Sequence, residues 1–182
     1  MSCHQKIVST FPGKKAVLLL TAAFFTLTSM IPHRANFSGE WKLNESKTED
    51  GNFLCIYDMG DRMRSETMKI AEQADFLTVE VPNSSPDAAL VTSQEKLTFD
   101  GKESEVNHIG RGKKFTVKWS GDGQTMTVNS VVYCDIDGKK EEFKVTEIWK
   151  LINEERSISV QYDLESTLIG ERVMKRVYDK VN

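Results

Sequence analysis

The sequence contains few of the residues that metal sites and nucleophilic catalysis use. Its 182 residues include three histidines and three cysteines. Only His108 and two of the cysteines lie within residues 36–182. No His/Cys cluster has zinc-ligand spacing, and neither a Gly-x-Ser-x-Gly elbow nor a phosphate-cradling glycine loop is present. Acids paired at a spacing suited to general acid–base chemistry are absent as well. We therefore expect a protein that is not an enzyme and that has no metal or other cofactor.

Clustered positive charge is also missing from most of the chain. The net charge is −3, and residues 1–35 contribute four positive charges and no acid, so residues 36–182 carry −7. Phosphate binding needs clustered lysine and arginine. The acidic balance therefore argues against nucleic acid as a partner.

The sequence has one long apolar run, and it lies near the N-terminus at residues 16–32. Basic residues precede it, which is the order found in a secretory signal. The run is at the short limit for a membrane span. We expect residues 1–35 to be a signal peptide, with Ala35 and Ser29 as candidate cleavage positions, or an uncleaved anchor. The protein would then be periplasmic or secreted, and would touch a membrane only through that segment.

From residue 36 onward, apolar and polar residues alternate with a period of two. Phe115, Val117 and Trp119, for example, are separated by polar residues. This pattern is typical of antiparallel strands with one buried and one hydrated face. The predicted strands are 37–43, 66–72, 76–82, 91–99, 103–108, 113–120, 125–135, 140–151, 156–165 and 171–179.

Turn signals separate these strands. Asp100-Gly101, Asp122-Gly123 and Asp137-Gly138 are typical hairpin dipeptides. Short connections predict an all-β, antiparallel up-and-down meander, and closure into a barrel of about ten strands would remove the exposed edges. A two-sheet sandwich fits less well, because it usually needs longer crossovers. Residues 44–64 and 83–90 interrupt the alternation, and we interpret them as loops.

Both ends of residues 36–181 carry family-like motifs. Residues 37–44, Phe-Ser-Gly-Glu-Trp-Lys-Leu-Asn, resemble the opening of lipocalin-like and fatty-acid-binding proteins, and residues 173–181 are similar to the closing Arg-x-Tyr strand of the latter. Internal pieces such as residues 147–151 look like an uncharacterised group of secreted bacterial lipocalin-like proteins. The chain thus resembles the lipocalin-like (calycin) family. This implies a lipocalin-like barrel over residues 36–182 that takes a small apolar or amphipathic ligand.

The chain departs from the fatty-acid-binding pattern after the first strand. That family places two short helices there as a lid, whereas residues 44–64 show no helical period and contain glycines. The entrance to the barrel would have to differ.

The resemblance gives Gly39 and Trp41 structural roles. Gly39 lets the strand bend or approach a neighbour closely, and Trp41 would plug the closed end of the barrel with its indole N–H seeking a partner. In the family this tryptophan packs against an arginine of the last strand, for which Arg172 and Arg176 are the candidates.

The last predicted strand holds the candidate ligand-binding residues. Arg176 and Tyr178 are two positions apart and so share one face of the strand, and the resemblance implies that they hold a ligand carboxylate. Met174 would extend that face with an adaptable apolar surface. The alternative is that Val173 and Val177 face the core and that Arg176 is solvated.

Glu147 shares the face of Phe143, Val145 and Trp149, where a carboxylate is costly unless it is paired. It could meet Arg176 inside the barrel, line a polar patch in a ligand cavity, or turn outward at a local bulge. Cys55 and Cys134 could form a disulfide in an exported protein, or stay as two buried thiols.

Two functions follow from these patterns. The first is an exported lipocalin-like binding protein for a small apolar or amphipathic, fatty-acid-like ligand, with Arg176, Tyr178, Glu147 and Met174 lining its site. The alternative is an envelope structural or interaction domain, a barrel with a filled interior and no small ligand.

Overall fold

The computed structural model describes residues 33–49, 62–83, 91–108, 111–136 and 138–181. They form ten antiparallel strands in a single sheet, which confirms the predicted all-β meander. Every predicted strand is present, with ends within two residues of those predicted. The strands are β1 (Gly39–Leu43), β2 (Thr67–Glu72), β3 (Phe76–Asn83), β4 (Val91–Thr98), β5 (Ser104–His108), β6 (Arg111–Trp119), β7 (Thr125–Ile136), β8 (Lys139–Ile152), β9 (Ser157–Ser166) and β10 (Gly170–Lys180).

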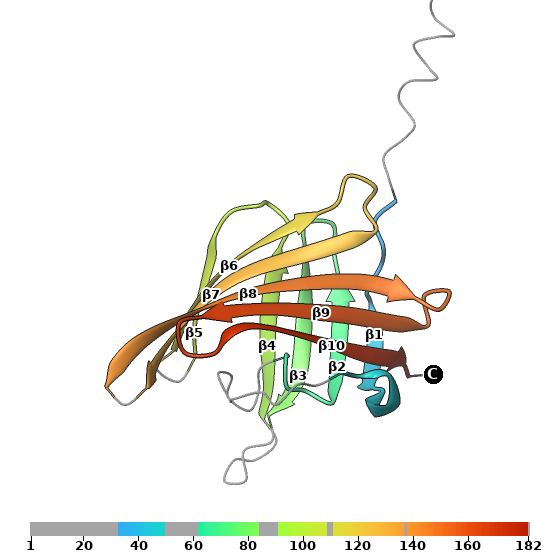
Figure 1. The fold of residues 1–182 in the computed structure, drawn as a ribbon. Coiled ribbons are helices and arrows are strands. Elements are labelled where there is room, and N and C mark those ends of the chain that lie inside the picture. Colours follow the sequence, from blue (N-terminus) through green and yellow to red (C-terminus); the bar gives the residue numbers. More distant parts are fainter. Residues whose placement is uncertain (1–32, 50–61, 84–90, 109–110, 137, 182) are drawn as a thin grey trace, which may run out of the picture. The chain divides into compact units, whose positions relative to one another are not determined.

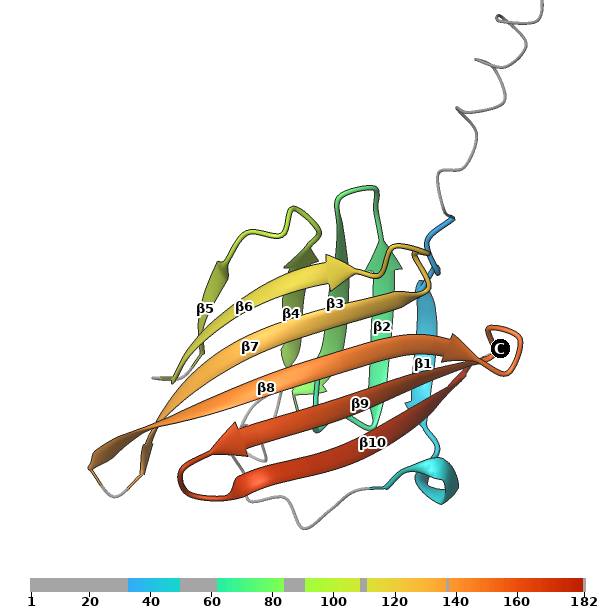
Figure 2. The same cartoon turned by 45° about the horizontal axis from the view of Figure 1, so that its top comes forward.

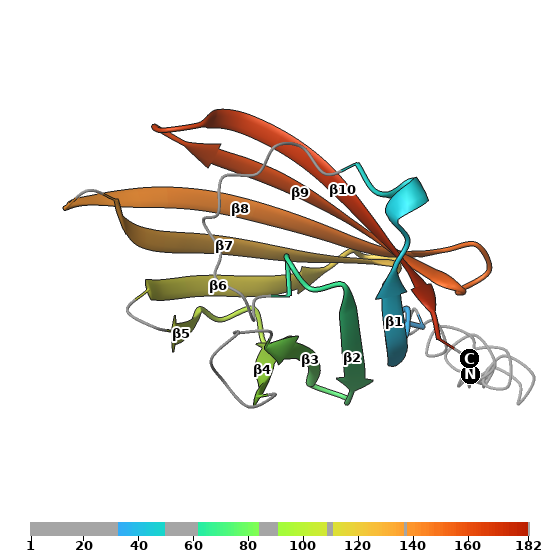
Figure 3. The ribbon, with the colours of Figure 1, turned by 90° about the horizontal axis from the view of Figure 1, so that it is seen from below.

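The sheet curls into a nearly closed barrel because its first strand pairs with its last. The strand order is β4-β3-β2-β1-β10-β9-β8-β7-β6-β5. Strands β1–β4 cross the direction of β7–β10 (Figures 1 and 2), and the view from below places β2–β4 opposite β8–β10 (Figure 3). Alternate side chains therefore converge on one enclosed core.

The barrel remains open between β4 and β5. These strands follow each other in the chain, but the sheet order leaves both at its edges. The hairpin predicted at Asp100-Gly101 is therefore wrong as a strand pairing, although Gly101 does turn the chain with φ +70°. Thr98 Oγ1 lies 3.2 Å from Ser104 Oγ across the gap. The dipeptide specifies a turn, and pairing needs the flanking strands to stay in register as well.

Residues 44–49 run alongside β10 and hydrogen-bond to its backbone. They contain a short 3-10 helix, η1 (Glu45–Lys47), which Asn44 caps by accepting a hydrogen bond from Lys47 N. Thr48 Oγ1 accepts from Val177 N at 3.2 Å. Val177 is 3% exposed, whereas Val173 is 68% exposed. This part of β10 is buried on both faces, so Val177 does not compete with Arg176 for the interior.

Several sequence expectations lie outside the described residues. Residues 1–32, which hold most of the predicted leader, and Cys55 are not among them, and the same holds for the side chain of Cys134 in β7. The leader and the disulfide stay predictions. Within the described part of the chain, no helix has both the length and the apolar character needed to cross a membrane.

Candidate functional site

Five aromatic side chains gather where β1 begins, and we call this cluster the aromatic end: Phe37, Trp41, Phe99, Trp119 and Trp149. Phe37 is fully buried, stacked on Trp119 at 5.7 Å between ring centroids and edge-on to Trp149 at 6.0 Å. Trp41 Nε1 donates to the carbonyl oxygen of Phe37 at 2.9 Å. The indole N–H of Trp41 thus has the partner that a buried tryptophan needs.

Gly39 and Lys180 shape the surroundings of Trp41. Gly39 has φ +146°, which side chains disfavour, and a Cβ added there would lie 2.9 Å from Lys180 Cε. The Lys180 ammonium stands over the Trp41 ring at 5.3 Å. A lysine of β10 therefore takes the place over the tryptophan that the resemblance assigns to an arginine.

The segment just before β1 is also part of the aromatic end. The Arg34 guanidinium lies 5.0 Å from the centre of the Phe99 ring and donates to Ala74 O at 2.7 Å. Ala35 N donates to Gly123 O at 2.9 Å. A Cβ on Gly123 would come within 3.2 Å of Arg34 Cα. Contacts with the barrel thus begin ahead of residue 36, the expected domain start.

Glu147 points into the barrel and is fully buried. It stands opposite Val128 and Tyr162 in regular ladders, so β8 has no bulge there. The Arg62 guanidinium donates to both carboxylate oxygens, with Nε 3.1 Å from Oε2 and Nη2 2.5 Å from Oε1. Trp149 Nε1 also donates to Oε2 at 3.1 Å. The expected alternative partner, Arg176, is replaced by Arg62, which comes from the connection between β1 and β2.

The Glu147 pair belongs to a larger charged group, which we call the interior polar cluster: Arg62, Glu95, Lys113 and Glu147. Arg62 also pairs with Glu95 of β4, and Glu95 Oε1 lies 3.2 Å from Lys113 Nζ of β6. Arg62 is 2% exposed and Lys113 is 8% exposed. Charges removed from water in this way are stable only when paired, and each of the four has an oppositely charged neighbour within the cluster.

Arg176 and Tyr178 face the same interior. Arg176 Nη1 donates to Met63 O at 2.5 Å and to Ser65 O at 3.2 Å. The Tyr178 hydroxyl donates to Ser65 O at 3.1 Å. Both side chains, and Met174 on the same face, are buried. The described acceptors of the Arg-x-Tyr pair therefore include backbone oxygens of the chain itself.

Tyr162 completes the polar lining between these two groups. Burial raises the pKa of this phenol well above its usual value of 10, and the nearby Tyr178 and Glu147 raise it further. Tyr162 is therefore a neutral hydroxyl at physiological pH. A neutral hydroxyl can donate a hydrogen bond to a polar group of a ligand.

Sequence reasoning identified Glu147, Met174, Arg176 and Tyr178 but missed Arg62, Glu95 and Lys113. Alternation carried a signal for two of these, since Glu95 shares a face with Leu97 and Lys113 shares one with Phe115. Arg62 had no such signal, because apolar and polar residues do not alternate in the segment that contains it.

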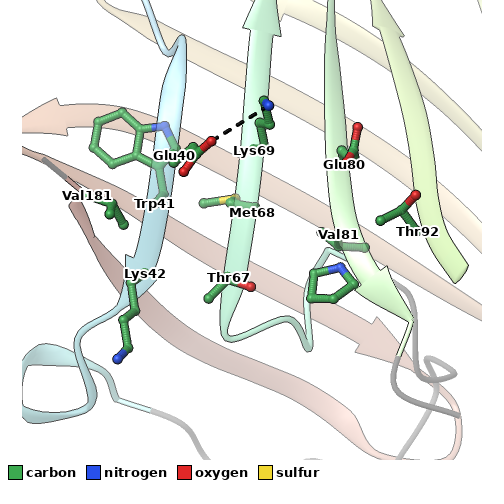
Figure 4. A pocket seen from close by; sticks show the side chains of 11 residues that line it. Glu40, Trp41, Lys42, Thr67, Met68, Lys69, Glu80, Val81, Thr92 and Val181 are labelled. Carbon is green, nitrogen blue, oxygen red and sulfur yellow. Dashed lines mark ion pairs between the residues drawn. The ribbon is translucent and has the colours of Figure 1, made fainter. Parts of the chain in front are cut away.

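A hollow lies along β1–β4. It has a volume of about 280 Å³ and is lined by residues of those strands and by Val181 (Figure 4). Glu40 and Lys69 pair across it at 3.6 Å with more than half of each side chain exposed. A small-molecule site usually places its few polar groups in an apolar, desolvated setting, and here the charges are hydrated. In the described part of the chain, no group of three His, Cys, Asp or Glu side chains could hold a metal ion.

Comparisons with known proteins support the fold. No family model matches the chain, and no curated protein matches it. The fold is similar to that of the zebrafish ileal bile acid-binding protein, solved in complex with cholic acid, with a TM-score of 0.51 and 19% sequence identity over 80% of this chain and 98% of that chain. At this identity the likeness shows the fold alone, a nearly closed antiparallel β-barrel.

Proposed function

We propose that this protein binds a small amphipathic molecule inside the barrel, with an apolar body and a carboxylate or a similar anionic group. The observation that carries the proposal is the placement of Arg176 and Tyr178. Both are buried, both lie on the inner face of β10, and both direct donors at acceptor oxygens. A guanidinium beside a phenol is suited to a carboxylate, because charge-assisted hydrogen bonds are strong in a desolvated site.

The apolar body of the ligand would gain from the rest of the inner face. Buried apolar residues from nine strands, such as Met126, Val160 and Met174, form one core cluster on this face. Transferring apolar surface from water into such a setting contributes about 25 cal/mol per Å². The similar zebrafish structure holds cholic acid, a carboxylic acid with an apolar ring system, which supports this ligand class.

A binding titration tests the proposal. The delipidated protein would be titrated with a fluorescent fatty acid and, in competition, with cholate. We expect saturable binding, at least tenfold weaker in Arg176→Met. Arg172→Met is the matched control, because Arg172 is an exposed arginine of the same strand. Thermal melts would show that both variants fold. Absence of saturable binding, or equal affinity in both variants, would refute the proposal.

A second candidate is a structural or interaction domain whose interior is filled. The observation that favours it is the burial of Arg62 and Met63, each 2% exposed, which places the chain's own residues among the inner side chains. Native mass spectrometry of protein purified from its source distinguishes the two candidates. A co-purifying small molecule supports the binding protein, and the same spectrum reports the mature N-terminus, which tests the proposed export.

A further inference from the structure

The segment 62–65 occupies the polar groups that the proposed function assigns to a ligand. Its backbone oxygens at Met63 and Ser65 accept hydrogen bonds from Arg176 and Tyr178. We infer that this segment and the ligand compete for Arg176 and Tyr178, so that the segment is a tethered inhibitor of the site. This inference rests on the proposed function.

The geometry of the contacts makes the two occupants exclusive. Arg176 Nη1 lies 2.5 Å from Met63 O, and Ser65 O lies within hydrogen-bond distance of both Arg176 and Tyr178. The two carbonyl oxygens of Met63 and Ser65 supply acceptors of the kind that the two oxygens of one carboxylate would supply. A carboxylate therefore reaches these donors only after the carbonyl groups have moved.

The segment is held at two points of unequal strength. At one end, the Arg62 guanidinium is bound to the carboxylates of Glu147 and Glu95. Withdrawing it would leave two buried carboxylates without that cation, which is more costly than exchanging the backbone carbonyl acceptors of Arg176 and Tyr178 for the carboxylate of a ligand. We therefore expect Arg62 to stay in place while residues 63–65 move. Arg62 then acts as the pivot of the displacement.

The Met63 side chain is the adjustable part of this contact. It is 2% exposed, so its burial favours the docked segment, and the atoms that bind Arg176 belong to its backbone. Truncating the side chain weakens docking without changing Arg176, Tyr178 or Glu147. The apparent dissociation constant equals the intrinsic constant divided by the fraction of binding-competent protein. A less firmly docked segment raises that fraction and tightens apparent binding.

The experiment compares the full chain with Met63→Ala and with Met63→Leu, a conservative control, using dansylaminoundecanoic acid as the fluorescent probe. We expect Met63→Ala to bind at least fivefold more tightly and Met63→Leu to stay within twofold of the parent. Hydrogen exchange provides the second measurement. Backbone amides of residues 63–65 in the parent protein should exchange faster when the probe is saturating. If Met63→Ala does not fold, this measurement alone tests the competition between the segment and the probe.

The outcomes separate the inference from the function on which it rests. Saturable binding with the same affinity in all three proteins, and with unchanged exchange at residues 63–65, overturns the competition and leaves the proposed function standing. Absence of saturable binding in every variant, including Met63→Ala, removes the proposed function and the inhibitor together.

Discussion

Phe37 and Glu147 are both fully buried in one barrel, yet their surroundings differ. Phe37 lies in the aromatic end among rings, where its neighbours lose only contact area if it is removed. Glu147 lies in the interior polar cluster, where Arg62 and Trp149 both donate to it. Trp149 joins the two regions, because its ring meets Phe37 and its N–H meets Glu147.

The two regions differ in what they contribute to the stability of the fold. Apolar packing stabilises in proportion to the surface it removes from water, so the aromatic end has a simple role in closing the barrel. A buried ion pair is weak evidence for stability, because hydrophobic residues of similar size often serve as well. The interior polar cluster is therefore expected to add little stability beyond what apolar residues of similar size would give. The following predictions test that division.

Phe37→Ala should give the largest effect. Truncating a fully buried phenylalanine leaves a cavity and removes two ring contacts, and we expect a loss of about 4 kcal/mol in the free energy of unfolding. Urea denaturation measures it. Phe76→Ala, a partly exposed ring on β3, is the control and should cost less, roughly 2 kcal/mol, because part of its area is already exposed in the folded protein. Similar losses in the two variants would show that the aromatic end is not a packed plug.

Glu147→Gln should cost about 3 kcal/mol, because the amide keeps the volume but leaves Arg62 with a weaker partner in a buried site. The control is Glu165→Gln, whose lysine partner lies 3.9 Å away with both side chains about 60% exposed. It should cost less than about 0.5 kcal/mol. The free energies of unfolding of both variants come from the same urea series. A Glu147→Gln cost as small as the control's would mean that the interior polar cluster is hydrated.

The sequence was sufficient for the fold because the signals for it are local. A period of two marked every strand, and alternation placed Glu147 on the inner face. Pairing across the barrel is not local. Across β8, β9 and β10, Arg176 lies in one row with Val160 and Trp149. Glu147 lies in the next inward-facing row, with Tyr162 and Met174. Arg62 reaches Glu147 from a segment without periodicity, so no pattern could predict that pair.

The missed features share one physical cause. The contact of residues 44–49 with β10 and the docking of residues 62–65 both depend on how irregular segments fold back on the sheet. Such segments are fixed by tertiary hydrogen bonds rather than by local propensity. The parts of the candidate site that belong to strands were predictable, and the parts supplied by the β1–β2 connection were not.

The smallest predicted effect concerns a charge at the margin of the aromatic end. Burial raises the pKa of Glu72 above its ordinary value of 4.5, although the hydrogen bond from Phe37 N and the charge of Arg34 lower it. A raised pKa means that the folded protein binds this proton more tightly than the unfolded chain does. The ionised carboxylate therefore costs stability above the folded pKa, and the cost disappears as the pH falls below the unfolded value.

Glu72→Gln keeps an acceptor for Phe37 N, which lies 3.0 Å from the carboxylate, and removes the charge. Because the group is partly exposed to solvent, we expect a gain of only a few tenths of a kcal/mol in the free energy of unfolding at pH 7, shrinking toward pH 4. Urea unfolding at both pH values measures it, with the exposed Glu154→Gln as a control of equal charge change. A Glu72→Gln variant less stable than the parent at pH 7 would show that attraction to Arg34 outweighs burial, and that the aromatic end, like the interior, depends on a charge pair.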